Sequence, residues 1–85
     1  MKKVWVLKTD IVLGGSVVTN DIEVYSNKEK AEQDFQNNVS KHIETSNKYG
    51  LEICTQETNV FESYYPHDIN DYHILVRMVE KPLID

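Results

Sequence analysis

One predicted helix lies among strands that carry apolar residues on both faces, and this combination limits what the chain can fold into. Apolar residues recur every four positions at Ala31, Phe35, Val39 and Ile43, which places them along one side of a helix. A single helix covers only one face of a small sheet. We therefore expect the apolar side chains on the other face to need a partner.

Sequence signals mark both ends of this helix. Ser26-Asn27-Lys28-Glu29 matches a capping box, in which the Ser26 hydroxyl accepts a hydrogen bond from the Glu29 amide and the Glu29 carboxylate accepts one from the Ser26 amide. Gly50 follows the apolar stripe and suits the left-handed backbone conformation that ends many helices. The sequence therefore predicts a helix that begins after Ser26 and ends before Gly50.

A β-hairpin is predicted before the helix. Gly14 and Gly15 can both adopt the positive backbone φ angles of a two-residue type I′ turn. With these glycines as the loop, Leu13 lies opposite Ser16, and counting along both strands places Tyr25 on the uncovered side. The pairs then expected on the helix-facing side are Trp5 with Val24, Leu7 with Ile22, Thr9 with Asn20 and Ile11 with Val18.

Two further strands are predicted after the helix. Residues 51–65 have the pattern of a long, rather polar strand, and residues 72–81 that of a strongly apolar one. The loop between them allows these strands to pair as a second hairpin. The pairs expected are Tyr65 with Tyr72, Ser63 with Ile74 and Phe61 with Val76.

Together these elements predict one domain over residues 1–85 with an α+β fold. Its two layers follow the order β-β-α-β-β, as a single four-stranded, mainly antiparallel sheet with one helix on one face. The most apolar strands, the first and the last in the chain, are expected side by side at the centre. The second strand then flanks the first, and residues 51–65 flank the last. An order in which the last two strands exchange places remains open.

Composition narrows the class of function. A net charge of −5, with basic residues that form no stripe, disfavours nucleic-acid binding. No apolar run approaches the roughly 20 residues of a membrane span, and the apolar run after Lys3 is too short for the core of a signal peptide. Cys54 is the single cysteine, so an internal disulfide is excluded and a reducing cytoplasm is the expected location.

Polar groups gather in one place, residues 64–73. The spacing of the candidate ligands there matches no common zinc or calcium pattern, so we expect a solvated loop with Asx turns at Asp68 and Asn70. Cys54 is expected on the outer sheet face as an unreactive thiol. We predict no catalytic residue, no cofactor and no bound metal. The four possible ligands in the loop region are His67, Asp68, Asp71 and His73.

The segment from Asp21 to Glu32, Asp-Ile-Glu-Val-Tyr-Ser-Asn-Lys-Glu-Lys-Ala-Glu, resembles a motif of small, uncharacterised bacterial and phage proteins with a β-β-α-β-β order. In those proteins a strand that ends in Val-aromatic-Ser leads into a helix that begins Glu-Lys-Ala. The resemblance implies the same strand-to-helix element and an origin in a mobile element or accessory gene. It implies no activity and no catalytic residue.

The sequence thus predicts a non-enzymatic protein that binds another protein, as a homodimer through the uncovered sheet face. Two alternatives remain: a phage or mobile-element inhibitor that captures a host protein, and a metal-binding or enzymatic site in the 64–73 region. Tyrosine and apolar residues dominate the predicted interface. Its residues are Val4, Val6, Tyr25, Tyr64, Leu75, Arg77 and Val79.

Overall fold

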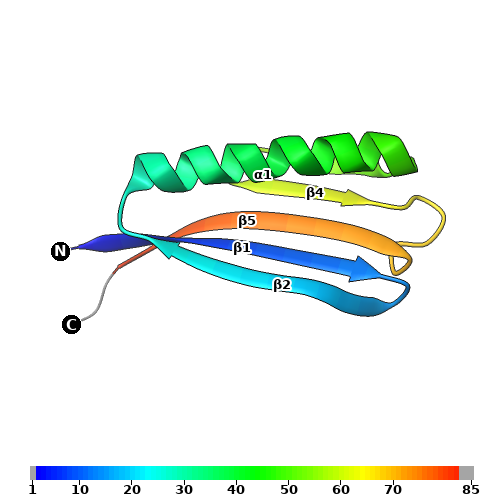
Figure 1. The fold of residues 1–85 in the computed structure, drawn as a ribbon, viewed down its shortest axis with the longest axis horizontal. Helices are drawn as coiled ribbons and strands as arrows, with labels where there is room; N and C mark the ends of the chain where they lie inside the picture. The colour runs from blue at the N-terminus through cyan, green and yellow to red at the C-terminus, as the bar shows by residue number, and fades with distance from the viewer. Residues whose placement is uncertain (1, 83–85) are drawn as a thin grey trace.

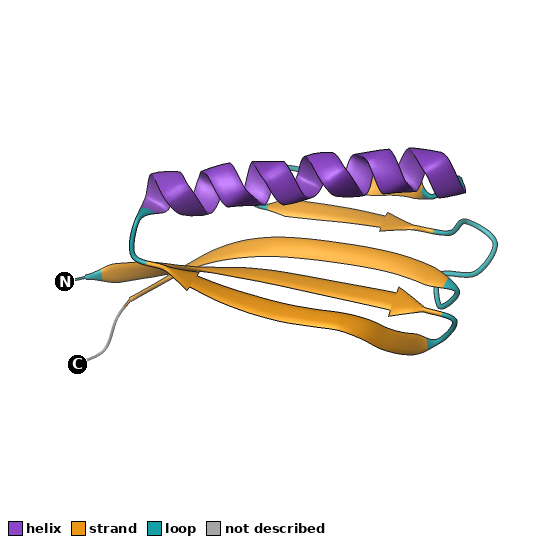
Figure 2. Ribbon diagram, in the orientation of Figure 1, coloured by secondary structure: helices purple, strands orange, loops and turns teal. Residues whose placement is uncertain are grey.

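A computed structural model describes residues 2–82 of the chain, so the extreme ends of the predicted domain, residue 1 and residues 83–85, lie outside the described residues. It has one helix on one face of one antiparallel sheet, in the strand order β2-β1-β5-β4-β3 (Figures 1 and 2). The predicted α+β class with a single covering helix is confirmed. The elements are β1 (Lys3–Leu13), β2 (Ser16–Tyr25), α1 (Lys28–Tyr49), β3 (Glu52–Gln56), β4 (Val60–Tyr64) and β5 (Tyr72–Pro82).

The sheet of the described residues has five strands, so the prediction of four is wrong. The segment predicted as one strand over residues 51–65 folds back on itself as β3 and β4. A hydrogen bond from the Glu57 amide to the Val60 carbonyl closes the turn between them, at 2.8 Å. An unbroken strand of that length would span roughly 50 Å, well beyond the end of the neighbouring β5. Folding back keeps both halves beside the helix.

The predicted order of the strands along the sheet is confirmed, because β5 pairs with both β1 and β4. The alternative, with the last two predicted strands exchanged, is wrong. The predicted register between β4 and β5 is also confirmed, since Ser63 lies opposite Ile74 and Phe61 opposite Val76. Phe61, Ser63, Ile74 and Val76 are all fully buried under the helix.

The first hairpin begins as predicted and then departs from the predicted register. Gly14 and Gly15 have φ angles of 61° and 82°, and Leu13 lies opposite Ser16. A β-bulge then follows, because Val12 pairs with Val17 while Ile11 pairs with Thr19, which leaves Val18 as an extra residue in β2. The pairs predicted for the rest of the hairpin are therefore wrong by one residue. The observed pairs include Trp5 with Tyr25, Leu7 with Glu23 and Thr9 with Asp21.

This bulge reverses the two faces of β2. Since side chains alternate along a strand, a shift of one residue moves each of them to the other side of the sheet. Ile22 and Val24, predicted to contact the helix, instead lie on the far face and are 59% and 63% exposed. Tyr25, predicted on the far face, points toward the helix and packs against the core.

The core lies between α1 and the middle strands. The predicted stripe of the helix is confirmed, because Ala31, Phe35 and Val39 are buried and Ile43 packs against the core. One polar contact crosses the layers: the Ser46 and Ser63 hydroxyls are 2.8 Å apart, and Ser46 Oγ also donates to the His42 carbonyl. The buried apolar core is Leu7, Phe35, Val39, Leu51, Phe61, Ile74 and Val76.

The two ends of α1 differ in how well the sequence predicts them. Gly50 ends the helix in the left-handed conformation, with φ 71°, as predicted. At the other end the capping residue is Asn27 and not Ser26, since the Asn27 side chain accepts a hydrogen bond from the Lys30 amide at 3.1 Å. Among the described residues no helix combines the length and the apolar character needed to cross a bilayer.

The position of the N-cap can be tested by a pair of substitutions. Asn27→Ala removes the acceptor of the Lys30 amide and should lower the free energy of unfolding by about 1 kcal/mol. Ser26→Ala, one residue away, should change it by less than about 0.5 kcal/mol. Urea unfolding followed by circular dichroism measures both, and a larger loss in Ser26→Ala would contradict the assignment of the cap.

Candidate interaction surface

The face of the sheet opposite α1 is called the outer face here, and six of the seven residues predicted for an interface lie on it. Val4 and Val6 of β1 lie on this face. Because β5 pairs directly with β1, Leu75, Arg77 and Val79 of β5 lie on the same face. Val6 lies opposite Val79, and Tyr64 of β4 lies opposite His73. The six predicted interface residues on the outer face are Val4, Val6, Tyr64, Leu75, Arg77 and Val79.

Tyr25 is the exception, and the prediction that it lies on the outer face is wrong. Its hydroxyl lies within hydrogen-bond distance of Asp34 Oδ2 on α1, at 2.7 Å, and of Glu23 Oε2. Burial and these two carboxylates raise the pKa of Tyr25, and the hydrogen bond from Tyr25 lowers the pKa of Asp34. Tyr25 therefore ties β2 to the helix and is unable to reach a partner on the outer face.

Ile22 and Val24 add apolar surface that the sequence pattern failed to indicate. Val24, Val6 and Val79 follow one another across β2, β1 and β5 and form an apolar row. Beside this row is a shallow hollow of about 280 Å³ lined by Val6, Lys8, Arg77, Val79 and Lys81. Because the sequence suggested a register without a bulge, it assigned Ile22 and Val24 to the core.

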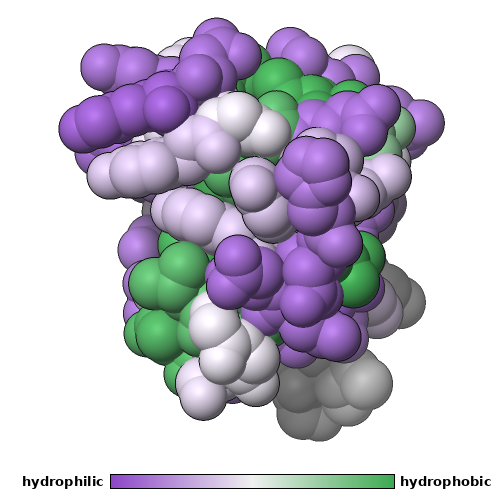
Figure 3. All heavy atoms as spheres, turned by 90° about the vertical axis from the view of Figure 1, so that its right-hand side faces the viewer, coloured by the Kyte–Doolittle hydropathy of each residue, from purple (hydrophilic) through white to green (hydrophobic). Residues whose placement is uncertain are grey.

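Further apolar surface lies at the end of the molecule that carries the Gly14-Gly15 turn. Leu13, Val17 and Val18 are 49%, 64% and 56% exposed there. Figure 3 looks onto this end and shows hydrophobic surface interrupted by hydrophilic side chains. Leu13, Val17 and Val18 therefore add exposed apolar surface beside the turn, with polar side chains around it.

Charges of opposite sign occupy the two halves of the outer face. The basic half holds Lys8, Arg77 and Lys81, and the acidic half holds Asp10, Glu62 and Glu52. Lys8 and Arg77 lie directly opposite each other on β1 and β5, where like charges repel. Lys8 is 4.0 Å from Asp10, whereas Arg77 forms no ion pair with any described residue. The outer face thus presents a basic area and an acidic area that meet where the Lys8–Arg77 row adjoins the row of Asp10, Leu75 and Glu62.

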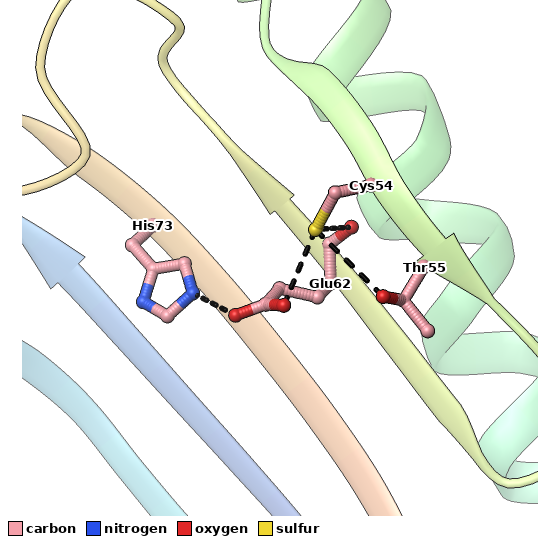
Figure 4. A network of polar contacts seen from close by, with 4 residues as sticks. All are labelled: Cys54, Thr55, Glu62 and His73. Atoms are coloured by element: carbon pink, nitrogen blue, oxygen red, sulfur yellow. Dashed lines mark hydrogen bonds and ion pairs between the residues drawn. The ribbon is translucent and has the colours of Figure 1, made fainter.

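A hydrogen-bonded group of Cys54, Glu62 and His73 lies in the acidic half, across β3, β4 and β5 (Figure 4). Glu62 accepts from both neighbours: His73 Nε2 is 2.6 Å from its Oε2 and Cys54 Sγ is 3.2 Å from its Oε1. The contact with His73, and then that with Cys54, lowers the pKa of Glu62. Burial, followed by the hydrogen bond to Glu62, raises the pKa of Cys54.

This arrangement does not activate the thiol. A nucleophilic cysteine needs a neighbouring base or a positive environment, and here a carboxylate stands between the sulfur and the imidazole (Figure 4). The neutral thiol is favoured, which supports the expectation of an unreactive Cys54. The carboxylate responsible is Glu62, which is distant from Cys54 in sequence and is brought close by the pairing of β3 with β4.

The possible metal ligands of the 64–73 region are not brought together. Asp68 accepts from the Asn70 amide at 3.0 Å, which is the Asx turn predicted at Asp68. His67 packs edge-on against the Tyr65 ring, and His73 is held by Glu62 on the sheet. The carbonyls of Asn70 and Asp71 accept from the amides of Gly15 and Gly14. Within residues 2–82 no three His, Cys, Asp or Glu side chains are placed to hold one metal ion.

Comparison with known proteins adds no relative. No protein-family model, no curated protein and no solved structure matches this chain.

The role of Glu62 in suppressing the thiol can be measured directly. Glu62→Gln removes the negative charge beside Cys54, so the pKa of the thiol should fall and alkylation by iodoacetamide near pH 8 should become roughly threefold faster. Thr55→Val removes a hydroxyl that donates to the sulfur at 3.8 Å and should slow the reaction slightly. Mass spectrometry over time gives both rates, and an unchanged rate in Glu62→Gln would contradict this account.

Proposed function

We propose that the protein acts by binding other proteins, without catalysis, and that a second copy of the chain docks on the outer face to form a homodimer. The observation that carries the proposal is the division of this face into a basic half and an acidic half. Such a face is complementary to itself when one copy is turned end for end. The expected location in a reducing cytoplasm is part of the same proposal, since the single thiol takes no part in a disulfide.

Charge selects one arrangement of the two copies. A two-fold axis that lies between the sheets and runs across the strands reverses the strand direction, so that the basic half of each copy faces the acidic half of the other. Lys8 then faces Asp10 of the second copy, and Arg77 gains the carboxylates that its own chain does not supply. An axis parallel to the strands would place like charges together.

The area of the outer face limits the affinity that we expect for the homodimer. Three strands of ten or eleven residues and two strands of five cover roughly 600 Å² in total, from the usual strand spacing and rise. This is less than the roughly 800 Å² per partner of a standard stable interface. The row of Val24, Val6 and Val79 supplies the apolar contact. We therefore expect a dissociation constant in the micromolar range, which corresponds to a binding free energy of about −8 kcal/mol.

A pair of charge-reversed variants tests this proposal. Lys8→Glu/Arg77→Glu makes the outer face mainly acidic, and Asp10→Lys/Glu62→Lys makes it mainly basic. Each variant alone should be monomeric at about 50 μM, well above the expected dissociation constant, because like charges then meet in the dimer. An equimolar mixture of the two should form a heterodimer with opposite charges in contact. Light scattering with size-exclusion chromatography, or native mass spectrometry, distinguishes these states.

The control variant changes the net charge by the same amount at residues away from the outer face. Glu44→Lys/Glu57→Lys alters two exposed residues away from the outer face and should remain dimeric. If the unmodified protein is monomeric at this concentration, or if the mixture of the two variants stays monomeric, the proposed homodimer is wrong.

A further inference from the structure

The free edge of β2 is the longest unpaired strand edge among the described residues. β2 has ten residues and pairs only with β1, whereas β3 at the other edge of the sheet has five. Natural edge strands are usually protected by lysine, proline, a bulge or a covering element, because their free N–H and C=O groups can pair with another chain. β2 contains no lysine or proline, and its bulge lies near the turn. The stretch Thr19–Tyr25 is left regular and open.

The two sides of this edge differ in chemistry. On the outer side, Ile22 and Val24 stand 59% and 63% exposed, so a strand added beside them would bury apolar surface. On the helix side, Asp21 and Glu23 line a groove of about 250 Å³ between β2 and α1. Neither carboxylate forms an ion pair with a described residue. The edge is therefore apolar on one side and acidic on the other.

Three further titratable groups, Asp34, Lys41 and His42, lie around the groove. Asp34 of α1 lines a second hollow of about 230 Å³ that shares Glu23 with the first. Lys41 of α1 lines both hollows and is the single cation on their walls. His42 lines the first, and burial lowers its pKa, so its ring is mainly neutral near pH 7. Asp34 forms an ion pair with Lys30 at 3.3 Å, so the carboxylates of Asp21 and Glu23 face the single positive charge of Lys41 across the groove.

The carboxylates beside the β2 edge disfavour pairing with β2 of a second copy and favour pairing with a basic segment. Two β2 strands paired about a two-fold axis would bring Asp21 and Glu23 of one copy close to the same carboxylates of the other, and such like charges destabilise pairing. An extended segment with alternating basic and apolar residues would instead place its cations beside Asp21 and Glu23, and its apolar side chains beside Ile22 and Val24. Both sides of the edge are then matched.

We propose that the β2 edge binds a basic, extended segment of a different protein as a sixth strand, by β-augmentation. Thr19–Tyr25 gives room for about seven residues of such a segment. This mode of binding pairs with the backbone of the β2 edge, and it overlaps with the proposed homodimer only at the outer-face side chains of Ile22 and Val24. It also gives a physical means by which the chain could capture a foreign protein.

The probe for this proposal is a capped synthetic peptide of about nine residues that alternates valine and lysine. It should bind with micromolar affinity, measured by calorimetry or by the anisotropy of a labelled peptide, and should slow amide hydrogen exchange in β2. Replacing its lysines by glutamates should abolish binding.

Two further peptides carry N-methyl groups on alternate amides, in complementary sets. An added strand pairs through one edge only, so one set should block binding and the other should be tolerated.

Matched variants of the protein complete the test. Asp21→Lys/Glu23→Lys should weaken binding of the valine–lysine peptide about tenfold or more, whereas Glu44→Lys/Glu57→Lys, with the same change in net charge, should weaken it far less. Lys8→Glu/Arg77→Glu, which removes the proposed dimer contacts, should bind the peptide at least as tightly as the unmodified protein does. Equal binding of both N-methylated peptides, or equal losses in the first two variants, would overturn the proposal, as would absence of binding at about 1 mM peptide.

Discussion

The single extra residue in β2 decides how the rest of the structure is arranged. Because Val18 is inserted after the turn, every later side chain of β2 exchanges faces. Tyr25 then reaches Asp34 and fixes the strand to the helix, while Ile22 and Val24 are released to the surface. The apolar row of the outer face and the acidic lining of the groove both follow from this one insertion.

The helix packs on one face of the middle strands, and this contact forms the core of the molecule. The apolar stripe of the helix lies over residues such as Phe61, Ile74 and Val76, and the Ser46–Ser63 contact satisfies two buried hydroxyls between the layers. β2 extends beyond this packed region (Figure 1). A strand that is anchored at both ends but poorly covered in between is well suited to binding, because its open edge needs little rearrangement to accept a partner.

Much of this fold could be predicted from the sequence because several signals agreed at the same positions. The spacing of Ala31, Phe35 and Val39, the paired glycines of the turn, and the match of Phe61 with Val76 each follow from local periodicity. The bulge could not be predicted, since Val17 and Val18 are both apolar and suit either face equally. The cap was assigned one residue early for a similar reason, because Ser26 and Asn27 are both good capping residues.

The central ladder joins the two ends of the chain, since β1 (Lys3–Leu13) pairs along its whole length with β5 (Tyr72–Pro82). During synthesis the first hairpin therefore emerges long before the strand that completes its sheet. Until then the core side of β1 has no neighbour on β5, and its apolar residues are exposed to other chains. Pairing between segments so distant in sequence also closes a long loop, so the sheet should assemble late and comparatively slowly. The order of the strands thus makes the pairing of β1 with β5 the step that we expect to limit the rate of folding.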